Sequence, residues 1–416
     1  MDDGRRTAVA IVRRPSPVAR RPQTMRLCFV CNEYPPGPHG GIGSMTQVLA
    51  RALVRAGHQV RVVGMYPADY PAPDYEEDRG VRVWRLRQPA YRLAWIPARI
   101  RLFRMVRKWG RRGAIDLVEV PDWEGWAAGW PRLRVPVVVR LNGSASYFTA
   151  EVGQSVERSL FWLERASLRR ADFWCSSSQY TAEKTKRLFR LPTGPDAVLY
   201  NPVEVPLATQ TERSRHKVVF TGTLTAKKGV ISLIDAWPRV VKTRPDAELH
   251  VYGKDGLTDD GNSVQAYLRS RLDGQLAGSV RFHNHVPRQC LLEELQSARA
   301  AAFPSYAEAF ALAPLEAMAC GCPTVYSSRG SGPELIRHGQ DGLLVDPDRP
   351  DQISEAITTL LEDDSLAQQL GDAGRRRVQE CFSVEALLPK NEAFYVKCIG
   401  DFHKRRNDQK ARKHPR

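Results

Sequence analysis

The chain has no stretch of 18 consecutive apolar residues, about the length that a membrane-spanning helix needs. It also lacks a long apolar run after its N-terminal arginines, so we expect no secretory signal and a cytoplasmic protein. Acidic residues are in the minority, with 46 Asp and Glu against 62 Lys and Arg, and the formal net charge is +16. This charge favours an anionic partner, which could be a nucleotide, a nucleic acid or a membrane surface.

A disulfide framework is also missing from a chain of this length. The eight cysteines include two close pairs, Cys28 with Cys31 and Cys320 with Cys322, whose spacing could suit zinc or redox chemistry. The first pair falls on a predicted buried strand, which sends side chains at i and i+3 to opposite faces. The pairs are therefore a weak sign of a metal site, and the sequence HNH at 283–285 is not enough for one. We expect reduced thiols and no metal or cofactor.

Short apolar runs alternate with longer helical stretches, which predicts an α/β fold with parallel sheets covered on both faces. The pattern restarts after a polar, proline-containing segment at 201–217. We therefore expect two domains, at 25–205 and 206–384, facing each other across a cleft. A last helical stretch at 385–405 has no strand after it. The predicted strands fall at 26–31, 59–65, 81–86, 116–120, 135–141, 216–224, 247–253, 279–286, 298–305, 322–328 and 341–346.

Both ends of the chain are basic and lack an apolar pattern. Residues 1–24 carry six arginines against Asp2 and Asp3, and residues 406–416 form a second basic tail. We expect both tails to be disordered.

Two glycine-containing loops each join a predicted strand to a predicted helix. Gly41 and Gly43 would let a phosphate or another anion approach the backbone at a helix start. An ordinary turn explains these glycines equally well, because Thr46 stands where a dinucleotide-binding fingerprint has its third glycine. In the second loop, Lys227 and Lys228 could bind an anion or form a solvated pair.

The segment PSYAEAFALAPLEAMACGCP, residues 304–323, is apolar and rich in small residues yet contains Glu308 and Glu316. Carboxylates are costly to bury without a partner. We predict a helix at 311–321, so that Glu308 precedes it and Glu316 lies about one turn inside it, at the sheet edge where ligands bind. Two carboxylates that accept hydrogen bonds from hydroxyls, beside a lysine and free amides for phosphate, predict a nucleotide-sugar site.

These motifs resemble those of the retaining glycosyltransferases of family 4, which have the GT-B architecture of two Rossmann-like domains. The spacing of Glu308 and Glu316 matches the E-x7-E motif of that family. The matching segments, spread over residues 25–400, are EYPPGPHGGIG, ERASLRRADFWCSSSQYTAEK, LYNPVE, FTGTLTAKKG, PSYAEAFALAPLEAMACGCPTV and GQDGLLVDP. The resemblance implies sugar transfer to a hydroxyl of a glycan, a lipid-linked molecule or a natural product. It favours UDP-hexose or UDP-N-acetylhexosamine as donor, with GDP-mannose as the alternative, and a C-terminal helix at 385–405 that crosses back to the first domain.

By the same resemblance, Glu308 contacts hydroxyls of the transferred sugar, Lys228 binds the diphosphate, and the two are the catalytic residues. Glu316 holds the ribose. The other implied donor contacts are Gly41, Gly43, Thr223, Lys227, His285, Val286, and the amides of Phe310, Ala311 and Leu312. Fixed cations and amides would stabilise the leaving phosphate, so no metal is required. In front-face attack, that phosphate would take the proton of the acceptor.

Three features depart from the family's pattern. Thr223 replaces the usual arginine, so a neighbouring lysine or arginine must supply a cation for the diphosphate. Asn142 replaces a histidine, and its amide can bond to a sugar hydroxyl but cannot take a proton. Ala309 and Ala311 replace the commoner glycines and narrow the space for the sugar. These changes bear on the choice of donor and leave loss of activity as an alternative.

The segment VEVPDWEGWAAGW, residues 118–130, follows and includes the end of a first-domain strand. Its carboxylates and tryptophans that we expect to face the cleft are Glu119, Asp122, Trp123, Glu124 and Trp126. Tryptophan beside carboxylates can bind a sugar or an amine-bearing acceptor, although tryptophans are also frequent in packing. We take Asp122, Trp123 and Glu124, together with Asn142, as candidate acceptor-binding residues.

Residues 91–112 carry eight basic residues and no acidic ones. A helix here would have an apolar face with Leu102, Phe103, Met105, Val106 and Trp109, and a basic face with Arg101, Arg104, Arg107, Lys108 and Arg111. Such a helix could lie on an anionic membrane near a lipid-linked acceptor. The alternative is a helix that packs on its own sheet and keeps its basic face in water.

Two further functions stay open. A GT-B protein could carry out other nucleotide-sugar chemistry, such as epimerisation, or be an inactive binder. A nucleic-acid binder would explain the charge, but the charge is strongest in the tails and no nucleic-acid-binding module is present. We therefore expect no nucleic-acid partner, and the sequence does not indicate an oligomeric state.

Overall fold

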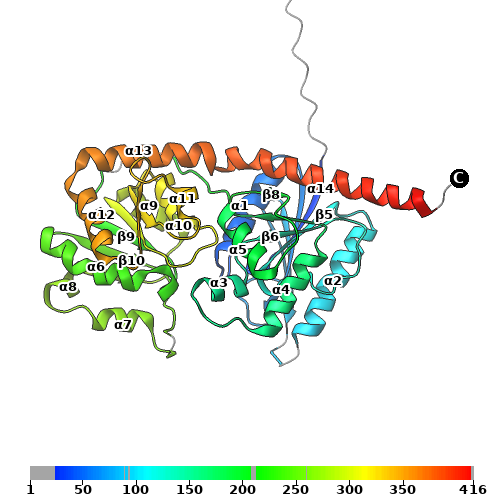
Figure 1. Ribbon diagram of the computed structural model, residues 1–416, viewed down its shortest axis with the longest axis horizontal. Helices are drawn as coiled ribbons and strands as arrows, with labels where there is room; N and C mark the ends of the chain where they lie inside the picture. Colours follow the sequence, from blue (N-terminus) through cyan, green and yellow to red (C-terminus); the bar gives the residue numbers. More distant parts are fainter. Residues whose placement is uncertain (1–23, 89, 92–93, 208–211, 259, 414–416) are drawn as a thin grey trace, which may run out of the picture.

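The computed structural model describes residues 24–88, 90–91, 94–207, 212–258 and 260–413. It consists of two α/β domains side by side, and the long C-terminal helix lies along the first of them (Figure 1). The predicted N-terminal tail lies outside the described residues, apart from its last residue.

The first domain contains an eight-stranded sheet with the order β3-β4-β2-β1-β5-β6-β7-β8, in which only the β3–β4 pair is antiparallel. Its strands are β1 (Arg26–Val30), β2 (Gln59–Pro67), β3 (Tyr75–Asp78), β4 (Val81–Gln88), β5 (Leu117–Pro121), β6 (Val137–Leu141), β7 (Phe173–Ser176) and β8 (Ala197–Val198). Its helices are α1 (Gly41–Arg55), α2 (Trp95–Arg111), α3 (Ala145–Glu151), α4 (Arg158–Arg170) and α5 (Gln179–Phe189), with the short 3-10 helix η1 (Trp123–Gly125).

Both faces of this sheet are buried, which is why its central strands are apolar without alternation. On β1, Leu27 and Phe29 pack into one core cluster, while Cys28 and Val30 pack into another on the opposite face. Cys31 belongs to the first of these clusters, so Cys28 and Cys31 lie on opposite faces, as predicted.

The second domain contains a six-stranded parallel sheet with the order β11-β10-β9-β12-β13-β14. Its strands are β9 (Lys217–Thr221), β10 (Glu248–Tyr252), β11 (Val280–His283), β12 (Ala300–Phe303), β13 (Thr324–Ser327) and β14 (Leu343–Val345). Its helices are η2 (Ala226–Lys228), α6 (Val230–Thr243), α7 (Val264–Ser270), α8 (Gly274–Ser279), α9 (Arg288–Ser297), α10 (Leu312–Ala319), α11 (Gly332–Leu335), α12 (Pro350–Glu362) and α13 (Asp364–Cys381).

Helix α14 (Val384–Lys413) runs from the second domain across the first (Figure 1). Its residues Phe394, Tyr395 and Cys398 are buried in the core of the first domain, so the helix crosses back as the resemblance implied. It extends beyond the predicted end at 405, and residues 406–413 of the predicted basic tail are helical. Lys and Arg are good helix formers, and positive charge suits the carboxyl end of a helix.

A buried polar network fixes α14 to the first sheet. The guanidinium of Arg140 on β6 donates to Glu119 Oε1 on β5 from Nε, at 2.7 Å, and to Asn391 Oδ1 on α14 from Nη2, at 2.8 Å. The Tyr395 hydroxyl donates to Glu119 Oε2 at 2.8 Å. The prediction that Glu119 faces the cleft is therefore wrong, because its carboxylate is buried and bonded within the core.

Helix α2 packs on its own sheet, which was the alternative to a membrane-facing apolar side. Leu102 and Val106 are fully buried, and Phe103, Met105 and Trp109 pack against the same core cluster. The apolar face predicted for membrane contact is therefore covered by the protein itself. The five basic residues assigned to its other face are not buried.

Candidate active site

The catalytic pair suggested by the sequence forms at the carboxyl ends of two adjacent strands. Lys228 ends η2, which follows β9, and Glu308 lies in the loop between β12 and α10. Lys228 Nζ lies 2.5 Å from Glu308 Oε1, and the Ser305 hydroxyl lies 3.4 Å from the same oxygen. The Tyr306 amide donates to the carbonyl of Lys227 at 2.8 Å and joins the two loops. The fold thus brings together a lysine and a glutamate that are 80 positions apart.

Glu316 lies on α10 and is paired with an arginine that the sequence did not single out. Arg288, the first residue of α9, donates to Glu316 Oε1 from Nε and Nη2 at 3.1 and 3.0 Å, and to Glu204 Oε2 from Nη1 at 3.0 Å. Burial lowers the pKa of Arg288, but the two carboxylates outweigh this effect and raise it. His285 and Val286, two of the implied donor contacts, lie in the segment just before Arg288.

Lys227 points to the other domain. Its ammonium lies 4.4 Å from the centroid of the Phe148 ring, on α3 of the first domain. Partial burial lowers the pKa of Lys227, with a further contribution from Lys228. Thr223, at the position of the missing arginine, is exposed. The second cation near Glu308 is therefore Lys227.

One backbone amide in the glycine loop of the first domain does not fit the predicted phosphate contact. The Gly43 amide donates to Glu33 Oε1 at 2.7 Å, so the chain's own carboxylate already occupies this donor. A Cβ at Gly43 would lie 2.0 Å from the Glu33 carbonyl oxygen, so glycine is required there by packing. At Gly41 an added Cβ would meet no atom within 4 Å, and Gly41 is exposed.

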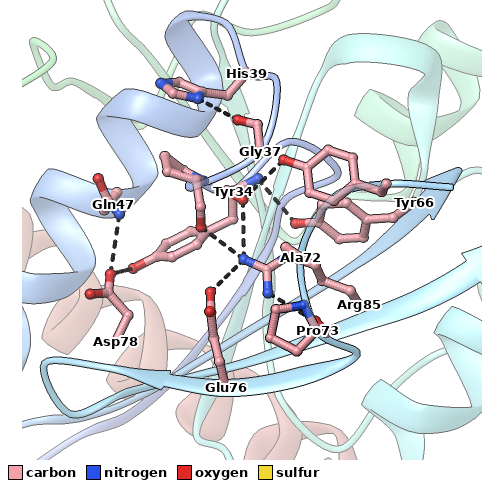
Figure 2. A network of polar contacts seen from close by, with 12 residues as sticks. Tyr34, Gly37, His39, Gln47, Tyr66, Ala72, Pro73, Glu76, Asp78 and Arg85 are labelled. Carbon is pink, nitrogen blue, oxygen red and sulfur yellow. Dashed lines mark hydrogen bonds and ion pairs between the residues drawn. The ribbon is translucent and has the colours of Figure 1, made fainter. Parts of the chain in front are cut away.

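A buried polar network holds the segment before this glycine loop (Figure 2). Arg85 Nη2 donates to the carbonyls of Tyr34 and Pro35 at 3.3 and 2.8 Å, and to Glu76 Oε1 at 2.5 Å. The Tyr34 hydroxyl donates to Asp78 Oδ2 at 2.7 Å. The loop that leads to Gly41 is thus fixed to β4 by buried hydrogen bonds, which are costly to break, and to β3 by partly buried ones.

Two of the candidate acceptor-binding residues, Asp122 and Asn142, contact each other. The backbone amide of Asn142 donates to Asp122 Oδ1 at 2.9 Å. Burial raises the pKa of Asp122 to about 7, and the nearby Glu164 adds to the shift. Asp122 Oδ2 and Asn142 Oδ1 are buried without a hydrogen-bond partner among the described residues. Unpaired buried acceptors are costly, so a hydroxyl-bearing ligand would be stabilised here.

Glu164, on α4, organises both segments of this region. Its carboxylate accepts hydrogen bonds from the amides of Glu124, Ala145 and Ser146 at 3.1, 2.9 and 3.1 Å. Glu164 lies in one of the segments that match the family, but its role does not follow from the sequence, because the donors to its carboxylate are backbone amides of two other elements, η1 and α3. Trp123 is partly buried, 6.4 Å from Phe148 between ring centroids.

Trp126, by contrast, does not face a ligand site. It is buried in a core cluster of the first domain, with the guanidinium carbon of Arg99 4.7 Å from its ring centroid. The expectation for this tryptophan is wrong, because the chain turns at η1 and sends it inward.

Two family models match this chain, one for each domain. Residues 40–202 match the glycosyl transferase 4-like domain, and residues 208–377 match glycosyl transferases group 1. The second range includes Lys228, Glu308 and Glu316. The chain belongs to the family 4 type of GT-B glycosyltransferases. It is therefore a transferase that uses a nucleotide sugar.

Other proteins and solved structures of this type match the glycosyltransferase over most of its length. Glycogen synthase of Mycobacterium tuberculosis is 28% identical over 401 residues, covering 89% of this chain and 94% of that protein. A GDP-mannose-dependent alpha-(1-6)-phosphatidylinositol monomannoside mannosyltransferase of Mycolicibacterium smegmatis is 29% identical over 372 residues, covering 84% and 92%. The structure of HepE from Anabaena with UDP and glucose has a TM-score of 0.67 at 17% identity, covering 90% of this chain and all of that one.

Within the described residues of the glycosyltransferase, no helix has the length and apolar character needed to cross a bilayer. In the same residues, no three His, Cys, Asp or Glu side chains are grouped so that they could hold a metal ion.

Proposed function

We propose that this glycosyltransferase is a retaining, metal-independent enzyme that transfers a hexose or N-acetylhexosamine from a UDP-sugar to a hydroxyl acceptor. The acceptor would be a glycan, a lipid-linked molecule or a natural product. The observation that carries the proposal is the Lys228–Glu308 pair at the start of α10. GDP-mannose is the alternative donor, because HepE was solved with UDP whereas the mannosyltransferase relative is GDP-mannose-dependent.

The proposed reaction depends on stabilising the leaving diphosphate. Lys228, Lys227 and the first amides of α10 supply positive charge, and α10 has no side-chain cap at Ala311 to occupy those amides. When a donor binds, Lys228 would turn from Glu308 to the diphosphate, and Glu308 would then accept hydrogen bonds from sugar hydroxyls. Lys227 would replace the cation that is missing at Thr223.

The acceptor would react on the same face of the sugar that the diphosphate leaves. As the bond from the anomeric carbon to the phosphate oxygen breaks, the acceptor oxygen bonds to that carbon and gives its proton to the departing phosphate. Asp122 and Asn142 would hold the acceptor, because each presents an unpaired buried oxygen. This mechanism needs no nucleophile from the protein and accounts for retention.

The choice of donor can be tested by a thermal-shift screen against UDP-, GDP- and ADP-linked sugars. A ligand that binds the native state raises the melting temperature, and a concentration of 100 Kd stabilises by about 2.7 kcal/mol. We expect UDP-sugars to give the largest rise. Incubation with a labelled UDP-sugar then separates the alternatives: a labelled acceptor indicates transfer, an isomerised nucleotide sugar indicates epimerisation, and binding without turnover indicates an inactive protein.

We also propose peripheral contact with an anionic membrane through the first turns of α2. Four apolar side chains of this region have exposed fractions between 41% and 56%: Tyr91, Trp95, Ile96 and Ile100. Arg101 and Arg104 follow them and are exposed. Arg99 Nη1 donates to the carbonyl of Gly125 at 2.8 Å, so this surface adjoins the candidate acceptor segment. A lipid-linked acceptor would then reach the site from the bilayer.

Vesicle flotation tests this contact. We expect the protein to float with anionic vesicles at low salt and to be released at high salt, because screening weakens the charge attraction. Replacing Trp95, Ile96 and Ile100 together by serine should reduce binding at least about tenfold, since buried apolar area drives insertion. The control is Leu257→Ser, at an exposed leucine of the second domain. Absence of wild-type binding at low salt would exclude the contact.

A further inference from the structure

The loop that carries Glu308 is hydrogen-bonded to the first domain through its backbone. The hydroxyls of Ser178 and Thr181 both donate to the carbonyl of Ala309, at 2.8 and 2.9 Å. The Tyr147 hydroxyl donates to the carbonyl of Glu308 at 3.2 Å. Ser178, Thr181 and Tyr147 are buried, so these bonds form in a region from which water is largely excluded.

A carboxylate of the second domain makes further hydrogen bonds to the first domain, at the start of α5. Glu334, on α11, accepts hydrogen bonds from the amides of Gln179 and Tyr180, both at 2.8 Å. The first amides of a helix have no partner within the helix, and its dipole favours negative charge there. We call the contacts of Tyr147, Ser178 and Thr181 with residues 308–309, together with those of Glu334, the interdomain clasp.

The first domain also packs closely against the loop of Glu308 at Gly143, which follows the candidate acceptor-binding residue Asn142. Gly143 has φ +87°, and a Cβ added there would lie 2.9 Å from Ala309 Cβ. The backbone beside Asn142 therefore touches the loop of Glu308 directly. Only glycine combines this left-handed conformation with so close an approach.

We propose that Tyr147, Ser178 and Thr181 are positioning residues for Glu308, an inference that rests on the proposed function of that carboxylate. Glu308 is held from two sides, by Lys228 at its carboxylate and by the clasp at its backbone. Once Lys228 turns to the diphosphate of a bound donor, the backbone contacts keep Glu308 in place. Because they end on carbonyl oxygens, they act whatever the side chain at 309.

This arrangement makes the first domain part of the donor site. Catalytic groups must be held within about 0.5 Å of their working positions, so loss of the clasp should lower kcat. By the proposed function the nucleoside diphosphate would be contacted mainly by the second domain, so its affinity should change little. Such a split between turnover and nucleotide affinity is not expected from general destabilisation.

Two threonines on the same helix give a matched test. Thr181→Val removes a hydroxyl that bonds to Ala309, whereas Thr185→Val removes a buried hydroxyl with no hydrogen-bond partner among the described residues. We expect Thr181→Val to lower kcat at least about tenfold with less than a twofold change in UDP affinity, and Thr181→Ser to restore most of the rate. Thr185→Val should leave kcat unchanged. Equal effects of the two valine variants, or an unchanged kcat for Thr181→Val, would overturn the proposal.

Hydrogen exchange tests the clasp without any need for turnover. The amides of Gln179 and Tyr180 should exchange at least about tenfold more slowly in the wild type than in Glu334→Ala, although first-turn amides ordinarily exchange fast. Unprotected amides in the wild type would overturn the inference even if the enzyme is active. Protected amides in a wild type that shows no turnover would instead count against the proposed function, and the positioning role would fall with it.

Discussion

Glu308→Gln should reduce sugar transfer by about 100- to 1,000-fold while leaving the melting temperature within a few degrees of the wild type. This magnitude is typical for the loss of one electrostatic contact to a transition state. Glutamine keeps the shape of the side chain but removes the negative charge, which would stabilise the positive charge that builds on the sugar and which pairs with Lys228. Initial rates with a labelled donor, measured beside a thermal melt, give both quantities.

The matched control for this change is Glu293→Gln, at an exposed glutamate on α9 that bonds to Gln289 of the same helix. It removes the same charge from the same domain and should leave the transfer rate unchanged. Lys228→Met should resemble Glu308→Gln in rate. If Glu308→Gln retains more than about a third of wild-type transfer, Glu308 does not act at the reacting sugar.

Glu119→Ala should lower the free energy of unfolding of the first domain by about 3–5 kcal/mol, the usual cost of removing one partner of a buried ion pair. The Arg140 guanidinium would remain buried without its carboxylate, and Tyr395 would lose its acceptor. Because the same network holds α14 against β5 and β6, the change should also loosen that helix. Urea unfolding followed by tryptophan fluorescence, which reports mainly on the first domain, measures the loss.

A double replacement separates the cost of an unpaired charge from the loss of packing. Glu119→Leu with Arg140→Met removes both charges and keeps apolar volume, so it should recover most of the stability lost in Glu119→Ala. Hydrogen exchange along α14 should follow the same order. A loss below about 1 kcal/mol for Glu119→Ala would mean that the network does not hold the helix.

Much of the architecture can be predicted from the local pattern of apolar residues. Every strand predicted from an apolar run is present, because central parallel strands are buried on both faces and must be apolar. The positions of Glu308 before α10 and of Glu316 inside it were also predicted, since helix starts are set by neighbouring residues. The strands that were missed are β3, β7 and β8, which are short, and β3 is acidic and antiparallel at the sheet edge.

The hydrogen-bond and ion-pair partners of polar groups were not predicted from the sequence. Glu119 was expected at the cleft and is instead in the core, whereas Arg288 and Glu164 hold predicted site residues but were not singled out. The Gly43 amide, expected to face an anion, bonds to Glu33 of its own chain. Glu119, Arg288 and Glu164 have partners on other elements, and nothing in the neighbouring sequence specifies them, whereas Glu33 lies only ten residues before Gly43 and the fold of the loop between β1 and α1 brings the two together.

The sequence by itself therefore determined the two α/β domains, the E-x7-E segment and the lysine loop, because each depends on apolar periodicity or on contiguous residues. Only the tertiary structure decided that Glu119 is a structural carboxylate whereas Glu308 lies at the candidate site. It also decided that α2 buries its predicted membrane face and that Ser178 and Thr181 donate hydrogen bonds to the loop of Glu308. The physical reason is that a hydrogen bond or ion pair forms between atoms that folding brings within about 3 Å, and their separation along the chain leaves no local trace.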